Sequence, residues 1–235
     1  MKLVGRVTVP QGEPSACVVL FHGFSGYKDE SGQLFVHAAR KAVELSMGCV
    51  RFDFRYSKTD KNASESDGSL KGMLPSEWIS DAKMIVAEAR RRFPDSKVGA
   101  IGLSMGGLVA INVAAQGLLD ALVTWSAPVD QGRLVSISRI VDFVRSGAVN
   151  DVKAFSDDIS RCNPIKVASK LVIPVLAVAG ELDDTVPPDQ ARLLFEAAQG
   201  GKSIYVVGGA DHVFSKQQAE VIGISMAWLS RFLQS

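Results

Sequence analysis

Short runs of Val, Ile and Leu recur along the chain and alternate with segments whose apolar residues follow a helical period. The runs predict strands at residues 16–21, 49–54, 98–101, 121–125, 175–179 and 203–207. Several of them are continuously apolar, which is typical of strands buried on both faces of a parallel sheet. Helical spacing predicts helices at residues 33–45, 76–93, 105–115, 188–198 and 217–233. This alternation predicts an α/β fold with a mostly parallel, doubly wound sheet.

Two segments interrupt the alternation. Residues 57–74 are polar and rich in Gly and Ser, which predicts a surface loop. Residues 128–170 contain no clear strand, and a long insert of this kind usually has a function, such as that of a lid. Part of the insert has helical spacing, at Leu134, Ile137, Val141 and Val144. No repeat or second domain is visible, so we expect a single domain over residues 1–235.

The composition narrows the choice of partners and compartment. Apolar residues make up 47% of the 235 positions and charged residues 22%, as in ordinary globular proteins. With a formal net charge of +1, no global attraction to nucleic acid or to a membrane surface is expected. Three widely spaced cysteines form no disulfide framework, and the chain has neither a signal-peptide stretch nor an apolar run of membrane-spanning length. We expect a cytoplasmic monomer or homodimer that acts on a small molecule.

The most informative stretch is VGAIGLSMGG at residues 98–107, where a predicted strand is followed by G-x-S-x-G and a predicted helix. A nucleophile in such a strand-to-helix turn is strained, and small residues two positions to either side let the backbone fold tightly. Gly102 and Gly106 supply those residues around Ser104. Ser104 is therefore predicted to project above the carboxyl edge of the sheet, where open α/β folds bind ligands. The N-terminal N–H groups of the next helix would face a developing oxyanion.

A serine nucleophile needs a general base, and histidine suits this task near neutral pH. The chain contains only His22, His37 and His212. His37 falls inside a predicted amphipathic helix and His22 directly follows a buried strand. His212 lies in a loop between the last predicted strand and the last predicted helix, where catalytic groups are often found. His212 is therefore the predicted base.

The carboxylate that should orient the histidine is expected in GELDDTVP, residues 180–187, where another strand ends. This stretch offers Glu181, Asp183 and Asp184. The order serine, acid, histidine along the chain is the one expected for a nucleophile elbow of this kind. Acidic residues here also favour the start of the next helix, a role that suits Glu181 and Asp184.

Together these motifs resemble the α/β-hydrolase superfamily over residues 18–233. Residues 180–187 resemble the family's G-x-x-D-x-x-V-P, whose first aspartate is the triad acid, and this implies Asp183. The GADH of residues 209–212 resembles the family's histidine loop.

The HGF of residues 22–24 resembles the family's oxyanion loop. This match implies that the backbone N–H groups of Phe24 and Met105 form the oxyanion hole, and that His22 is a structural residue of the loop. Removing one such donor typically costs about 2.7–4 kcal/mol of transition-state stabilisation.

The segments HGFSG, RFDF and GADHVF look most like small bacterial carboxylesterases of the cinnamoyl/feruloyl type, and also like the monoglyceride lipase and serine aminopeptidase-like branch. In the cinnamoyl branch an insert forms a cap over the acyl pocket. Residues 129–170 match that insert in position and size, which implies a small helical cap. The chain departs from the family in RYSKTD, residues 55–60, which lacks the glycines of the usual R-G-x-G-x-S.

The expected function is hydrolysis of small or aromatic acyl esters by Ser104, His212 and Asp183 through an acyl-enzyme. No cofactor or metal is expected, because the chain has no H-E-x-x-H, Cys/His cluster or P-loop. A thioesterase, a monoacylglycerol lipase or a small acyl-peptide hydrolase would use the same triad, and a catalytically silent ligand-binding protein is the alternative outside enzymes. Candidate substrate contacts in the insert are Phe143, Val144 and Phe155.

Overall fold

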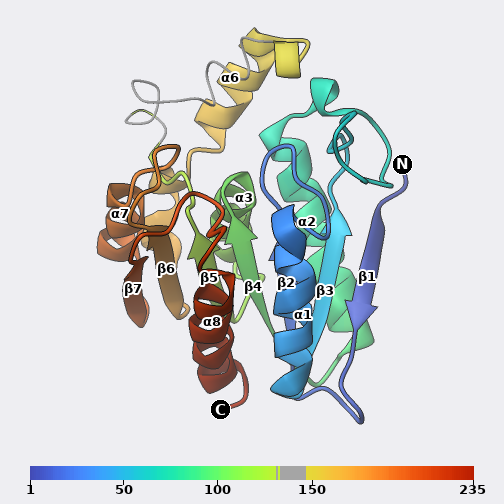
Figure 1. Ribbon diagram of the computed structural model, residues 1–235, viewed down its shortest axis with the longest axis vertical. Helices are drawn as coiled ribbons and strands as arrows, with labels where there is room; N and C mark the ends of the chain where they lie inside the picture. Colours follow the sequence, from blue (N-terminus) through green and yellow to red (C-terminus); the bar gives the residue numbers. More distant parts are fainter. Residues whose placement is uncertain (131, 133–146) are drawn as a thin grey trace.

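The computed structural model describes residues 1–130, 132 and 147–235. Within them, seven strands form one sheet in the order β1-β3-β2-β4-β5-β6-β7 (Figure 1). β1 runs antiparallel to β3, and the other neighbouring pairs are parallel. The strands are β1 (Val4–Thr8), β2 (Ala16–Phe21), β3 (Met47–Asp53), β4 (Lys97–Leu103), β5 (Ala121–Trp125), β6 (Val175–Gly180) and β7 (Lys202–Val207).

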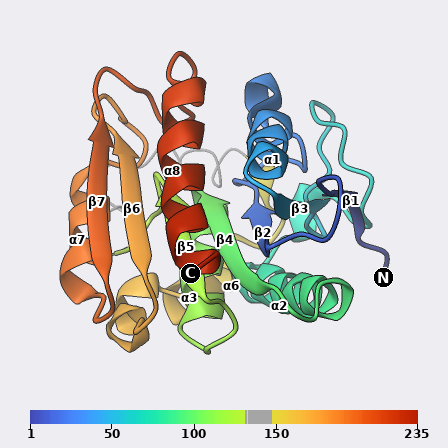
Figure 2. The ribbon, with the colours of Figure 1, turned by 90° about the horizontal axis from the view of Figure 1, so that it is seen from below.

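Helices cover both faces of the sheet, as Figures 1 and 2 show. One face carries α1 (Leu34–Glu44) and α8 (Gln218–Leu233), and the other carries α2 (Pro75–Arg92), α3 (Met105–Ala114) and α7 (Asp189–Ala197). A further helix, α6 (Val152–Arg161), lies above the carboxyl edge of the strands. Short 3-10 turns occur at Ser31–Gln33, Leu70–Gly72, Pro164–Lys166 and Ala168–Lys170. The predicted doubly wound α/β architecture is thus confirmed.

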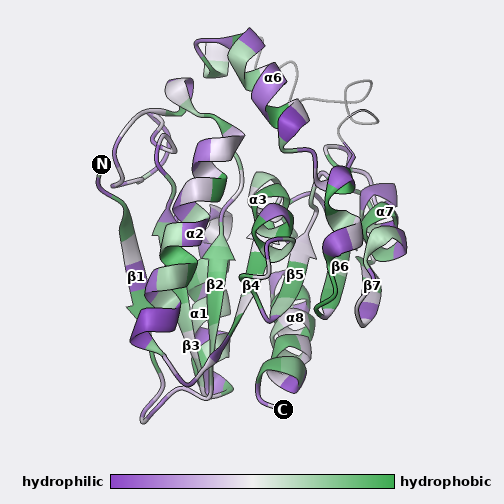
Figure 3. Cartoon of the chain, turned by 180° about the vertical axis from the view of Figure 1, so that it is seen from behind, coloured by the Kyte–Doolittle hydropathy of each residue, from purple (hydrophilic) through white to green (hydrophobic). Residues whose placement is uncertain are grey.

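The strands supply two apolar cores, one on each side of the sheet. In β2, Cys17, Val19 and Phe21 face the core under α2 and α3, whereas Val18 and Leu20 face the core under α1 and α8. All of them are fully buried, and each buried aliphatic side chain of this size contributes roughly 1.5–3 kcal/mol. Figure 3 shows the strands as largely hydrophobic at the centre of the molecule, with hydrophilic positions on the helices outside. The predicted burial on both faces is confirmed for β2.

Each predicted strand and helix is present, with ends within two residues of the expected positions. One strand and one α-helix of the described residues have bounds that the sequence pattern does not predict. β1 is an edge strand whose residues are exposed or half-buried, so its sequence VGRVT carries no apolar run. In α6, only Phe155 and Asp158 are buried, and one buried apolar side chain gives no helical period that the sequence could show.

Residues 57–74 were expected to form a surface loop, but part of this segment packs inward. Ser57, Ser64 and Ser66 are at most 5% exposed. Ser57 Oγ lies 2.8 Å from Ser64 Oγ, and Ser66 Oγ donates to the Asp53 carbonyl oxygen at 2.7 Å. The serines can be buried because each hydroxyl has a hydrogen-bond partner, either in the loop or at the end of β3, which polarity alone does not reveal. Among the residues that the structure describes, no helix is both long enough and apolar enough to cross a membrane.

Candidate active site

Ser104 lies at the turn between β4 and α3. Its backbone has φ 51° and ψ −120°, a conformation that L-residues rarely adopt. Strain of this kind costs of order 1–3 kcal/mol and persists only where the surrounding structure enforces it. Here the Ser104 N–H donates to the Trp125 carbonyl oxygen at 2.8 Å, which ties the turn to β5. The residue stands at the carboxyl edge of the sheet, as the sequence predicts.

Gly102 and Gly106 are needed because three backbone segments meet behind the serine. A Cβ atom on Gly106 would overlap the carbonyl oxygen of Phe21 at the end of β2. A Cβ atom on Gly102 would overlap the Gly106 carbonyl group and lie 2.7 Å from the Gly107 Cα. The glycines therefore let α3 start directly behind Ser104, which is the physical content of the G-x-S-x-G pattern.

His212 lies between Ser104 and Asp183. Its Nε2 is 3.0 Å from Ser104 Oγ, and its Nδ1 is 2.8 Å from Asp183 Oδ2. Because an ionised carboxylate can only accept hydrogen bonds, Nδ1 donates to Asp183 and Nε2 accepts from the serine hydroxyl. The structure thus brings the predicted nucleophile, base and acid together in one chain of hydrogen bonds.

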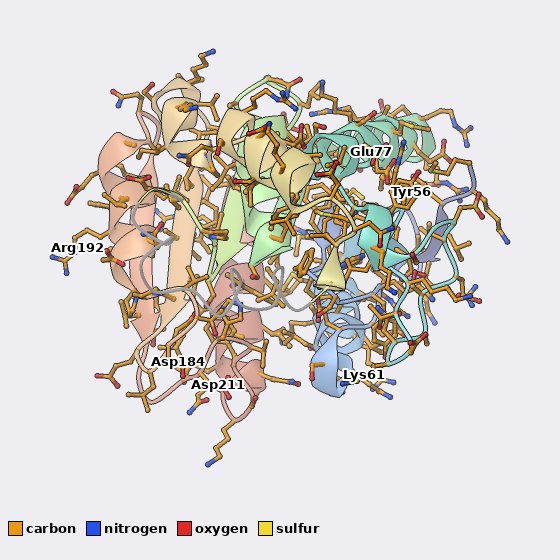
Figure 4. The ribbon with its side chains drawn as sticks, turned by 90° about the horizontal axis from the view of Figure 1, so that it is seen from above. Tyr56, Lys61, Glu77, Asp184, Arg192 and Asp211 are labelled. Carbon is orange, nitrogen blue, oxygen red and sulfur yellow. The ribbon has the colours of Figure 1, made fainter. Side chains whose placement is uncertain are left out.

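The three carboxylates that end β6 have separate environments. The Asp183 side chain is fully buried, and its Oδ1 accepts from the N–H groups of Thr185 at 2.9 Å and Val186 at 2.8 Å. Asp184 is exposed, and Figure 4 places it near Asp211 and away from Tyr56 and Glu77.

Glu181 instead supports the loop that carries His212. Its Oε2 accepts from the Gly209 N–H at 2.8 Å. A Cβ atom on Gly180 would lie 2.5 Å from the Ala210 carbonyl oxygen and 2.6 Å from that of Asp211. Gly180 is therefore the residue that lets the histidine loop come down onto the end of β6.

The far side of the histidine loop is anchored by Phe214 and Asp211. Phe214 is fully buried, with its ring centroid 6.1 Å from that of Trp125. Asp211 Oδ1 accepts from the Ser215 N–H at 2.9 Å. Burial acts to raise the pKa of Asp211, but the hydrogen bonds from Ser215 and the nearby His212 ring outweigh it and lower that pKa below its usual value.

Phe24 lies in the loop after β2, and His22 fixes the peptide that precedes it. His22 Nδ1 donates to the Gly23 carbonyl oxygen at 2.8 Å, and His22 Nε2 accepts from the Phe54 N–H at 3.0 Å. In a trans peptide, the Phe24 N–H points away from the Gly23 oxygen, so His22 sets its direction. A Cβ atom on Gly23 would lie 3.5 Å from Ser104 Cβ, which brings this peptide beside the nucleophile.

His22 is suited to this holding role because it is neutral. Complete burial lowers the pKa of its imidazole from 6.5 to about 4. The neutral ring has one donor and one acceptor, and both are used. The other predicted oxyanion donor, Met105, is the first residue of α3, where the N–H groups and the positive end of the helix dipole point outward.

The helix α6 contacts the oxyanion loop from above. The Phe155 and Phe24 ring centroids are 5.9 Å apart, and Phe155 is 4% exposed. At the other side of α6, the Asp158 carboxylate accepts from the Ser76 N–H at 2.8 Å, at the start of α2. Five insert residues named from the sequence lie outside the described residues: Leu134, Ile137, Val141, Phe143 and Val144.

The other reactive groups of the chain are placed away from this chemistry. His37 is exposed on α1. All three cysteines are free and buried, and burial raises the pKa of Cys17 to about 12 and that of Cys162 to about 11. Across residues 1–130, 132 and 147–235, no three His, Cys, Asp or Glu side chains converge as they would to hold a metal ion.

Two buried carboxylates near the oxyanion loop were not singled out from the sequence. Asp53 accepts from the Lys28 N–H at 2.7 Å and the Glu65 N–H at 2.8 Å, and its Oδ2 is 3.2 Å from Lys28 Nζ. An aspartate that closes an apolar strand was an available signal for it. Glu30 accepts from the Gly23 N–H at 2.6 Å across seven residues of loop, a contact that no local pattern indicates.

Comparison with known proteins assigns this arrangement to a family and a fold. A model of the dienelactone hydrolase family matches residues 3–228. Est1E from Butyrivibrio proteoclasticus, solved with ferulic acid bound, has a TM-score of 0.77 at 18% identity, covering 98% of this chain and 95% of that one. A monoacylglycerol lipase from Paleococcus ferrophilus has a TM-score of 0.73 at 22% identity, covering 99% and 100%. A dienelactone hydrolase from Anabaena variabilis has a TM-score of 0.72 at 15% identity, covering 99% and 93%.

Proposed function

Because the chain belongs to the dienelactone hydrolase family of α/β-hydrolases, we propose that it is a serine carboxylic ester hydrolase. The observation that carries the proposal is the continuous set of hydrogen bonds from Ser104 through His212 to Asp183. Hydroxyl, imidazole and carboxylate in this order form the constellation of nucleophilic acyl transfer. Family membership supports a hydrolase in general. The three hydrogen-bonded side chains support acyl transfer through a serine nucleophile as its reaction.

In the first step, Ser104 Oγ attacks the ester carbonyl carbon while His212 Nε2 takes the hydroxyl proton. The 3.0 Å separation of these two atoms allows that transfer without movement of the ring. Asp183 stays ionised, holds Nδ1–H in place and stabilises the imidazolium. His212 then gives its proton to the leaving alcohol as the carbon–oxygen bond breaks.

The carbonyl oxygen becomes negatively charged in the tetrahedral intermediate. The N–H groups of Phe24 and Met105 bind this oxyanion, one from the loop held by His22 and one from the start of α3. Because both peptides are fixed before substrate arrives, little reorganisation is needed at the moment of reaction.

In the second step, water replaces the alcohol and His212 removes its proton. The resulting hydroxide attacks the acyl carbon, and His212 returns the proton to Ser104 Oγ as the tetrahedral intermediate collapses to the carboxylic acid and free Ser104. The same histidine therefore acts as base, then acid, in each half of the cycle.

Small or aromatic acyl groups are the substrates that we propose. The aromatic pair of Phe24 and Phe155 lies where the oxyanion loop meets α6, and it favours a flat apolar group beside the nucleophile. Est1E, which binds ferulic acid in its crystal structure, shares this fold. Residues 129–170 act as the cap of a single domain in this proposal, and α6 is the helix of this cap that contacts α2 and the oxyanion loop.

The test is a panel of esters with Ser104→Ala as the control. The panel contains p-nitrophenyl acetate, butyrate and octanoate, methyl ferulate, a monoacylglycerol and an acyl thioester. Turnover of short esters and methyl ferulate that disappears in Ser104→Ala supports the proposal, and labelling of Ser104 by a fluorophosphonate should accompany it. A preference for the monoacylglycerol or the thioester would instead indicate a monoacylglycerol lipase or a thioesterase. Absence of both turnover and labelling contradicts the enzyme and favours a ligand-binding protein.

A further inference from the structure

Gly23, the residue before the proposed oxyanion donor, is held through both of its peptides. His22 binds the Gly23 carbonyl oxygen, and the Glu30 carboxylate binds the Gly23 N–H. The second bond is short, 2.6 Å between Gly23 N and Glu30 Oε1, as expected of a hydrogen bond to a charged acceptor. Glu30 Oε2 accepts from its neighbour, the Ser31 N–H, at 3.2 Å. Both carboxylate oxygens are therefore committed to backbone N–H groups.

Glu30 reaches this place at a conformational cost. It is 6% exposed, and its backbone has φ 58° and ψ 172°, a region that is almost restricted to glycine. A Cβ atom on Gly26 would overlap Glu30 Oε1, so the glycine at position 26 leaves room for the carboxylate. Strained residues of this kind cluster at functional sites, where the strain is part of how the site is organised.

The Glu30 carboxylate also lies within electrostatic reach of the catalytic histidine. Burial raises the pKa of Glu30, while the bonds from Gly23 and Ser31 and the charge of protonated His212 act to lower it. A Cβ atom on Gly23 would lie 3.5 Å from both Glu30 Oε1 and Ser104 Cβ. The carboxylate and the nucleophile therefore flank the same glycine.

We propose that Glu30 is a positioning residue of the oxyanion hole, whose carboxylate holds the Gly23 N–H so that the next peptide presents the Phe24 N–H to the substrate. This inference rests on the proposed ester hydrolase function. His22 and Glu30 form hydrogen bonds to the two peptides that flank Gly23, and together these bonds prevent rotation of the peptides. Since the oxyanion forms only when the serine attacks, loss of one of these hydrogen bonds weakens binding of the transition state more than binding of the ester.

The test compares Glu30→Ala and Glu30→Gln with wild type and with Glu44→Gln, a control that removes an exposed carboxylate at the end of α1. Each variant is first checked for a wild-type circular dichroism spectrum and a cooperative melting curve. The expected result for Glu30→Ala is a kcat lower by about 10²-fold, the loss typical of one oxyanion donor. KM should stay within about threefold, because a selective loss of kcat marks an interaction of the transition state.

Glu30→Gln should recover most of this loss, because its amide oxygen can still accept from the Gly23 N–H. A role limited to folding would instead change stability and leave kcat of the folded fraction intact. If wild type hydrolyses esters and folded Glu30→Ala keeps the wild-type kcat, the inference is wrong while the proposed function stands. If wild type hydrolyses no ester, both the proposed function and the inference about Glu30 are wrong.

A second route keeps the inference testable if Glu30→Ala does not fold. Gly26→Ala leaves Glu30 in the chain but places a methyl group where Oε1 now lies. It should lower kcat, because the methyl group displaces the oxygen that accepts from the Gly23 N–H, and the loss should be of similar size in the Glu30→Gln background, where an amide oxygen takes the place of Oε1. A wild-type kcat in folded Gly26→Ala would overturn the inference.

Discussion

Asp183 and Asp184 are neighbours in the sequence with opposite environments, and the difference predicts opposite effects of the same substitution. Asp183→Asn should lower kcat by about 10⁴-fold, because an amide no longer holds His212 in the required tautomer. Asp184→Asn is the matched control and should keep near wild-type kcat, since Asp184 is exposed. Steady-state kinetics on the best ester of the panel measures both. A large loss in Asp184→Asn with normal turnover in Asp183→Asn would reverse the assignment.

Sequence patterns predict those parts of the site that lie in local motifs. Ser104 was found because the glycines that its turn needs are two residues away, and His212 because few histidines compete. Asp183 needed the register of a family motif, since its burial becomes visible only in three dimensions. Glu30 could not be found, because its bond to Gly23 depends on the path of a loop and on an unusual φ.

At the scale of elements, apolar runs predict strands best where both faces are buried. β2 and β5 have the predicted bounds and are fully buried. β1 was missed because an edge strand half in solvent needs no apolar run, and pairing with β3 determines its conformation instead. α6 lies in the insert for which the family resemblance implies a helical cap, but its bounds are not readable from the pattern, because a helix that lies across an edge buries few side chains.

The attachment of α6 provides a test at this scale, through adjacent aspartates. Asp158 is buried and accepts from the Ser76 N–H at the start of α2, whereas Asp157 is exposed and pairs with Lys153. Asp158→Ala should lower the free energy of unfolding by roughly 0.5–2 kcal/mol, the range for loss of a helix cap. Asp157→Ala should leave stability unchanged. Urea denaturation of both variants measures the difference, and equal effects would show that the contact with α2 is not what secures α6.

For the whole molecule, the neutral His22 makes stability depend on pH. The pKa of His22 is about 4 in the folded chain and 6.5 for an ordinary histidine, so between these pH values the unfolded state binds a proton that the native state does not. Stability should therefore fall as pH falls from about 6.5 to about 4, by an amount on the order of 3 kcal/mol for this group.

Urea denaturation at pH 7.5, 5.5 and 4.5 measures this dependence. His22→Gln should be less stable at pH 7.5, because a buried residue with two hydrogen bonds is altered, but its stability should fall less steeply with acid. His37→Gln, at an exposed histidine, should follow the wild-type slope. Parallel slopes for wild type and His22→Gln would mean that other groups determine the acid sensitivity.

The packing of the indole rings also gives the molecule its own optical reporters. Trp125 is fully buried, contacts Phe214 of the histidine loop and accepts the Ser104 N–H through its carbonyl oxygen. Trp78 is fully buried as well, with its ring centroid 5.1 Å from that of His22. A buried, fluorescent tryptophan therefore lies beside the histidine loop, and another lies beside the loop that follows β2. Movements of the histidine loop and of the loop after β2 should appear in the intrinsic fluorescence of the unlabelled protein.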